Sequence, residues 1–205
     1  MKRRSIFAFI ALSLAMLIPA PGRFVYGVVL VLEMNIIVFL NCFFTLAVKQ
    51  LGLEKIKTVL VLTFILSITI FYRQFMIVLQ PEIVLTLGYV MYLCPVSTFV
   101  IGYLFDSEEK PLVENIKNKM LNMLFYSLYA LLFFLLRDLF GFGTITFFGA
   151  NHMIFEKVLF EFERVRILSI FASIPGALIL TSVILFLYIL LREKMSIVRS
   201  AEVNK

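Results

Sequence analysis

Six long apolar runs constrain this chain more than any other feature of its sequence. A helix that crosses the hydrocarbon of a bilayer needs about 20 apolar residues, and most of the runs reach or nearly reach that length. Backbone polar groups find no partner in lipid, so each run must be a helix or a strand of a closed barrel. Barrel strands alternate in polarity at every second residue and these runs do not, so we predict helices. The runs are Ser5–Ala20, Phe24–Val48, Thr58–Gln80, Ile83–Phe105, Met120–Leu136 and Ile167–Leu191.

The composition is that of a chain whose solvent is mostly lipid. Of the 205 residues, 62% are hydrophobic and 16% are charged, whereas soluble domains average about 45–50% apolar and about 25% charged residues. We therefore predict an all-α membrane protein with six transmembrane helices in a single domain, residues 1–205. The net charge of +6 does not indicate a nucleic-acid partner, because the basic residues form short clusters between the apolar runs.

The basic residues also predict the orientation of the chain. With six spans, 13 of the 19 lysines and arginines lie on the side that holds both termini. Cytoplasmic loops carry the excess of basic residues, so we expect both termini in the cytoplasm. The first run also resembles a signal peptide, with Lys2-Arg3-Arg4 before it and Pro19 and Pro21 at its end. It has no Ala-x-Ala cleavage site, so we interpret it as a transmembrane helix, with cleavage of residues 1–20 as the alternative.

Two connections differ from the apolar runs. We expect Asp106–Lys119 to be a charged cytoplasmic loop, and Arg137–Arg166 to be an outer connection with a re-entrant or interfacial stretch. The glycines Gly141 and Gly143 follow a membrane helix instead of a strand, so they do not indicate a phosphate-binding loop. His152 is the only histidine and has no second histidine or acidic cluster in metal-ligand spacing, so we interpret it as a solvated loop residue.

Polar side chains inside the apolar runs are candidates for function, because ionisable groups in hydrocarbon are costly. They are Glu33 and Asn41 in the second run and Arg73 and Gln74 in the third. Helical rise places Glu33 roughly 13 Å and Arg73 roughly 10 Å from the same outer surface, so the two can form a pair. The alternatives are that Arg73 extends to the surface while Glu33 is protonated, or that these residues form an ion or substrate site.

Four short motifs, in order, resemble one family of membrane proteins. They are Tyr72-Arg73-Gln74, Pro81-Glu82, Arg137–Thr144 (RDLFGFGT) and Ile174–Leu178 (IPGAL). The chain resembles the small six-helix membrane subunits shared by the Rnf complex and the sodium-translocating NADH:quinone reductase (Nqr), over nearly its whole length. Within the third motif, the residues similar to the family signature are Arg137, Asp138, Gly141 and Gly143.

The resemblance implies a fold and a role. It implies two inverted three-helix repeats, and an integral subunit of an electron-transport complex in the bacterial inner membrane. Such complexes couple electron flow from NADH or ferredoxin to the translocation of Na⁺ or H⁺. The implied partners are other membrane and redox subunits, and the subunit is not catalytic alone.

The chain departs from the family where the family holds an iron–sulfur cluster. Paired subunits of the family each supply one cysteine from helix I and one from helix IV. The corresponding positions here are Ser13 or Leu14, and Thr98, which offer no thiolate to iron. Cys42 and Cys94 lie at other positions of the sequence. We interpret them as buried apolar residues that pack in the core, with relocated ligands of a cluster as the alternative. We therefore expect a divergent or structural subunit that bears no cluster.

Two other functions compete with this interpretation. The substrate-binding membrane component of a vitamin transporter of the energy-coupling-factor (ECF) type is also about six helices long. It would need a stripe of small residues for docking, for which the chain offers Ala11 and Ala15. A stand-alone ion transporter is the third possibility.

Overall fold

The computed structural model describes residues 17–96, 112–149, 154–159 and 166–203, most of which are helical. Three helical segments within this part of the chain are long and apolar enough to cross a membrane, which confirms the prediction of apolar helices of membrane-spanning length. The helices are α2 (Phe24–Gln50), α3 (Lys57–Leu79), α4 (Pro81–Leu87), α6 (Leu112–Phe142) and α7 (Ile174–Val203), with the 3₁₀ helices η2 (Glu54–Ile56), η3 (Gly88–Tyr92) and η4 (Arg166–Ala172) and the strands β1 (Thr144–Phe148) and β2 (Ile154–Val158).

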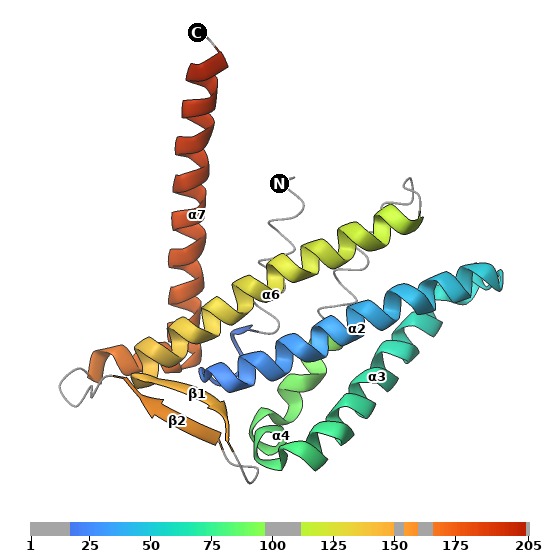
Figure 1. The fold of residues 1–205 in the computed structure, drawn as a ribbon, viewed down its shortest axis with the longest axis horizontal. Helices are drawn as coiled ribbons and strands as arrows, with labels where there is room; N and C mark the ends of the chain where they lie inside the picture. The colour runs from blue at the N-terminus through green and yellow to red at the C-terminus, as the bar shows by residue number, and fades with distance from the viewer. Residues whose placement is uncertain (1–16, 97–111, 150–153, 160–165, 204–205) are drawn as a thin grey trace.

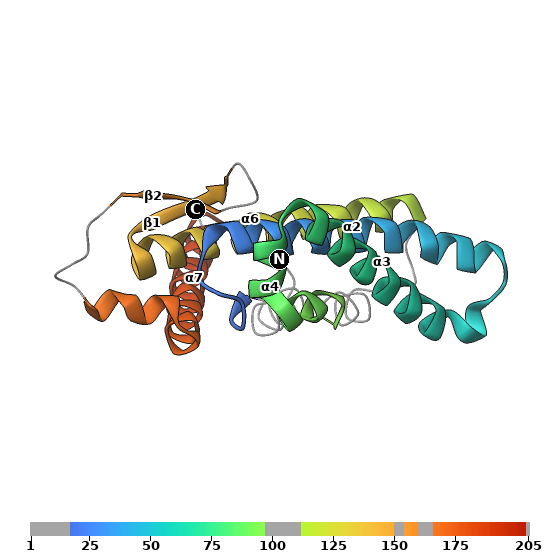
Figure 2. The same cartoon turned by 90° about the horizontal axis from the view of Figure 1, so that it is seen from below.

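Helix α2 lies between α3 and α6 (Figure 1). Helix α6 runs antiparallel to α2, so that the last turns of α6 lie against the first turn of α2. Strands β1 and β2 form an antiparallel hairpin beside this end of the pair. Helix α7 starts at the same end and projects away from the other helices, and Figure 2 shows it almost along its axis.

The core lies where α2, α3, α6 and the segment Pro81–Val96 meet. Its side chains are apolar on the inner faces of these helices, and include Leu30, Met34, Ile37, Ile65, Ile68, Ile83, Leu87, Met91, Ala130 and Phe133. The opposite faces carry large exposed apolar side chains such as Phe43, Phe71 and Leu128. A soluble protein rarely exposes so much contiguous apolar surface, and lipid is the solvent that suits it.

The predicted boundaries of the second and third runs agree with α2 and α3, but other boundaries were wrong. The predicted loop Asp106–Lys119 is helical from Leu112, because lysine and glutamate are good helix formers and a helix can continue beyond the hydrocarbon. Helix α6 also continues past Leu136 to Phe142, where Gly143 adopts a φ of 69°. A glycine in this left-handed conformation commonly ends a helix.

The fourth and sixth runs are not continuous helices. Within the described part of the fourth run, α4 ends at Gly88, which has a φ of 50° and is followed by 3₁₀ turns. In the sixth run, η4 and α7 are separated by Ser173. The hydroxyl of Ser173 accepts a hydrogen bond from the backbone N–H of Gly176 at 3.4 Å, which makes Ser173 the N-cap of α7.

The segment Arg137–Arg166, which we predicted to be an outer connection, contains a hairpin that we did not predict. In its register Thr146 faces Glu156 and Phe147 faces Phe155. The segment Thr144–Phe148 consists of three β-branched residues followed by two aromatic ones, a composition typical of a strand. Most of the first run, residues 97–105 of the fourth, and His152 lie outside the described residues. Six spans and inverted repeats therefore remain predictions.

Helix α6 packs tightly against α2 at Gly27. A Cβ atom built on Gly27 would lie 2.3 Å from the ring of Phe134, which is fully buried. No side chain larger than hydrogen fits there unless Phe134 or one of the helices moves.

We expect Gly27→Ala to lower stability by about 1–3 kcal/mol, because overpacking displaces well-packed neighbours. Thermal unfolding of the detergent-solubilised protein measures the change. Leu32→Ala, which shortens a side chain of α2 that is 49% exposed, is the control and should stay within about 0.5 kcal/mol of the wild type. A Gly27→Ala protein as stable as the wild type would show that the two helices do not pack this closely.

Candidate functional site

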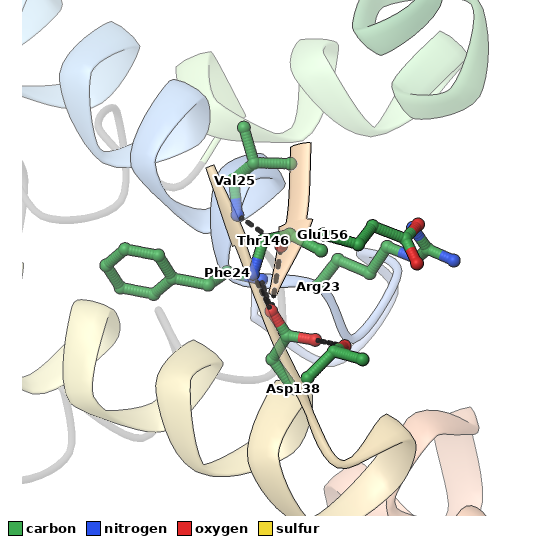
Figure 3. A network of polar contacts seen from close by, with 7 residues as sticks. Arg23, Phe24, Val25, Asp138, Thr146 and Glu156 are labelled. Carbon is green, nitrogen blue, oxygen red and sulfur yellow. Dashed lines mark hydrogen bonds and ion pairs between the residues drawn. The ribbon is translucent and has the colours of Figure 1, made fainter. Parts of the chain in front are cut away.

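A buried carboxylate at the end of α6 joins three parts of the fold. Asp138 is fully buried. Its Oδ2 accepts hydrogen bonds from the backbone N–H of Phe24 at 3.0 Å, and from the backbone N–H and hydroxyl of Thr146 at 2.8 and 2.7 Å. Its Oδ1 accepts one from the hydroxyl of Thr144 at 3.0 Å. Figure 3 shows Asp138 between the start of α2 and β1.

Asp138 acts as the cap that α2 lacks in its own sequence. The N-cap residue of α2, Arg23, makes no side-chain capping hydrogen bond. The first N–H groups of a helix have no partner within the helix, and they attract negative charge. Asp138 accepts a hydrogen bond from the N–H of Phe24, and the hydroxyl oxygen of Thr146 accepts one from the N–H of Val25 at 3.2 Å.

The preceding residue, Arg137, makes the complementary contacts. It is also fully buried. Its guanidinium donates to the carbonyls of Leu17 and Ala20 at 2.8 and 2.9 Å, and to those of Phe171 and Ala172 at 3.3 and 3.1 Å. These carbonyls belong to the segment before α2 and to η4. Arg137 and Asp138 are thus both buried, and each is satisfied by groups from other segments of the chain.

The two glycines of this motif have separate structural reasons. A Cβ on Gly141 would lie 2.8 Å from the backbone nitrogen of Ala172, so only glycine lets η4 approach α6 closely enough to reach Arg137. Gly143 turns the chain from α6 into β1 with its positive φ. We refer to Arg137, Asp138, Gly141, Gly143 and Thr144 as the α6 junction.

An exposed ion pair lies beside the junction. Arg23 pairs with Glu156 of β2, and the side chains are 28% and 42% exposed. The guanidinium of Arg23 also lies 5.1 Å from the ring centroid of Phe142. This ion pair connects the second strand of the hairpin to the residue before α2.

A second polar cluster lies inside the helix bundle, around Glu33. The side chain of Glu33 is fully buried, and neither carboxyl oxygen has a hydrogen-bond partner among the described residues. The thiol of Cys94 lies beside the carboxyl, but it is directed toward the carbonyl of Leu30, with Sγ and oxygen 3.8 Å apart. The hydroxyl of Tyr72 in α3 donates to the carbonyl of Val29 at 2.9 Å.

The structure does not form the predicted pair of Glu33 and Arg73. Arg73 is partly exposed, and its Cζ lies 5.9 Å from the ring centroid of Tyr92. Gln74, the next residue, is exposed. Asn41, two turns along α2 from Glu33, has a buried side-chain oxygen without a partner among the described residues.

The two thiols lie in different environments. Cys94 is fully buried in the Glu33 cluster, and Cys42 is partly buried on α2. The described residues contain no group of three or more His, Cys, Asp or Glu side chains that could hold a metal ion. The positions Ser13, Leu14 and Thr98 lie outside the described residues.

Sequence reasoning identified the α6 junction as a motif but missed the residues that complete it. Thr146 was part of an apolar stretch in that interpretation, and its place eight residues after Asp138 gave no sign of a contact. The roles of Tyr72 and Cys94 around Glu33 were missed as well. Their signal was their position within apolar runs, where a polar atom needs a partner.

Asp138→Asn tests the junction. All four groups around the carboxylate of Asp138 donate hydrogen bonds to it, so the NH₂ group of an asparagine would face other donors and accept none of these bonds. We therefore expect the free energy of unfolding to fall by about 3 kcal/mol or more. Thermal unfolding in detergent measures it, and Glu156→Gln is the matched control. Its partly exposed ion pair contributes about 1 kcal/mol or less. Equal losses in the two variants would contradict the central place of Asp138.

Comparison of the chain with protein-family models, curated proteins and solved structures finds no match. Arguments about its function therefore rest on its own residues.

Proposed function

We propose that this chain is an integral membrane subunit of an Rnf/Nqr-type electron-transport complex, in which it has a structural role and bears no iron–sulfur cluster. It is an inner-membrane protein of bacteria with six spans, and its partners are membrane and redox subunits. The complex couples electron flow to the translocation of Na⁺ or H⁺, and this subunit performs no catalysis alone.

The observation that carries the proposal is the identity of the residues that hold the fold together. The longest of the four motifs, Arg137–Thr144, supplies hydrogen bonds that join α6 to α2, β1 and η4. Tyr72, which belongs to another of the motifs, joins α3 to α2 through the hydrogen bond from its hydroxyl to the carbonyl of Val29. Gly176 of the last motif lies against η4, because a Cβ there would be 2.0 Å from the carbonyl oxygen of Ile170. Residues that determine packing imply a shared fold.

The packing of α2 with α6 gives further support. Two inverted three-helix repeats, helices I–III and IV–VI, would make α2 and α6 equivalent second helices. Helices related by an axis in the membrane plane run in opposite directions. Helices α2 and α6 are antiparallel neighbours, as this relation requires.

The residues also support a subunit without a cluster. Iron–sulfur clusters are held by cysteine thiolates. Leucine or serine and threonine stand at the family's two cysteine positions, residues 13–14 and 98. Cys94 is instead engaged with the carbonyl of Leu30.

Purification from the native membrane tests the partners. We expect an affinity-tagged chain to co-purify with flavin-bearing redox subunits, and the chain separated from them to contain less than about one iron atom per two chains. Mass spectrometry, iron analysis and absorption spectra are the measurements. Co-purification with ATP-hydrolysing subunits would contradict the proposal and favour the vitamin transporter. Stoichiometric iron that is lost on Cys42→Ala or Cys94→Ala would contradict the absence of a cluster.

Reporter fusions test the orientation. We expect a reporter that is active only in the periplasm to be inactive when it is fused after Lys205, because the basic residues place both termini in the cytoplasm. The same reporter fused within the hairpin connection, at Ala150, should be active and serves as the control. Activity at the C-terminus would contradict six spans with a cytoplasmic end.

A further inference from the structure

Glu33 is a buried ionisable group that the packing of the described helices does not account for. Asp138 is equally buried, yet both of its oxygens accept hydrogen bonds. The carboxyl of Glu33 has no hydrogen-bond partner among the described residues and no ion pair with Arg73. We propose that Glu33 is a proton-binding site within the membrane, and that Cys94 and Tyr72 are the neighbouring groups that respond to its proton.

The place of Glu33 in α2 puts the site within the hydrocarbon. Glu33 is nine residues after Phe24, the first residue of α2. At about 1.5 Å per residue, it lies roughly 13 Å along a helix that is long enough to span the membrane. A carboxylate at this depth is costly, by about 2.5–3.5 kcal/mol on insertion scales for aspartate. The neutral acid is the form that this position can hold at low cost.

The groups around the carboxyl do not compensate a negative charge. On the α3 side lies Tyr72, whose hydroxyl donates to the carbonyl of Val29. After η3 comes Cys94, whose thiol is directed toward the carbonyl of Leu30. On the α6 side, Tyr126 is fully buried near Cys94. None of these side chains carries a positive charge.

Release of the proton would change the hydrogen bonds of the cluster. Val29 and Leu30 lie one turn before Glu33 in α2, so their carbonyls are also acceptors within the helix. When Glu33 gives its proton to water, a carboxylate remains. The thiol of Cys94 can then turn from the carbonyl of Leu30 and donate to this carboxylate. One proton leaves, no covalent bond other than its O–H bond breaks, and the exchange of the Cys94 hydrogen bond from Leu30 to Glu33 alters the contact between α2 and the segment after η3.

The ligand of this site is a proton instead of a metal cation. Hard cations such as Na⁺ and Mg²⁺ take several oxygen ligands. The Glu33 cluster offers the two carboxyl oxygens of Glu33, the soft thiol of Cys94, and the hydroxyl of Tyr72, which is already hydrogen-bonded to a backbone carbonyl. The inference uses only contacts within this chain, so it does not depend on the proposed redox partners.

Infrared spectroscopy of the full chain in liposomes tests the site directly. A protonated carboxylic acid has a carbonyl stretch that is separate from the carboxylate bands and shifts in heavy water. We expect this band at neutral pH, its loss in mildly alkaline buffer, and its complete absence in Glu33→Gln. Glu82→Gln, which changes an exposed acid at the start of α4, should leave the band in place.

Three results would overturn the proposal. They are a wild type without such a band, a band that does not change with pH, and a band that is lost when NaCl replaces KCl at constant pH. The last would make sodium the ligand. If Glu33→Gln does not fold, a hydrophobic carbodiimide that reacts with protonated carboxyl groups can be used on the wild type. We expect one adduct per chain, mapped by mass spectrometry to Glu33 and lost in alkaline buffer. Label only at other acids, or label that persists at alkaline pH, would contradict the proposal.

Discussion

The hydrogen bonds of two adjacent residues at the end of α6 hold the fold together. Arg137 donates to four backbone carbonyls, and Asp138 accepts from two backbone N–H groups and two hydroxyls. Burial of single charges is costly, but here opposite charges are adjacent and each is satisfied by backbone groups. The starts of α2 and β1, the segment before α2 and the end of η4 all depend on this one position of α6.

Two buried acids on neighbouring helices show how the same residue chemistry serves different ends. The surroundings of Asp138 supply four donors, which stabilise a fixed carboxylate. The surroundings of Glu33 supply donors that are directed to the carbonyls of Val29 and Leu30. The first arrangement stabilises one structure, and the second leaves a group that can gain or lose a proton. Helix α2 links them, because Asp138 caps its start and Glu33 lies nine residues after its first residue.

The sequence predicted the helices whose bounds depend on the length of an apolar run. It did not predict contacts that depend on the rotation of a helix about its axis or on backbone groups far away in the chain. Helices α2 and α3 followed from apolar length alone, with every predicted end within two residues of the observed one. The predicted pair of Glu33 and Arg73 does not form, because the depth of a residue in the membrane does not determine the direction in which its side chain points. Tyr72 faces α2, and the next residue points about 100° away around the helix. The partners of Asp138 could not be predicted, since backbone N–H groups carry no sequence signal.

Native-state hydrogen exchange tests the central place of Asp138 most directly. The amides of Phe24 and Thr146 are far apart in the chain but share one carboxylate oxygen. If that oxygen holds both segments, the two amides open in one event, and their opening free energies agree within about 0.5 kcal/mol. Exchange of Thr146 at a much lower free energy than Phe24 would show that the hairpin opens alone, and would contradict this account of the fold.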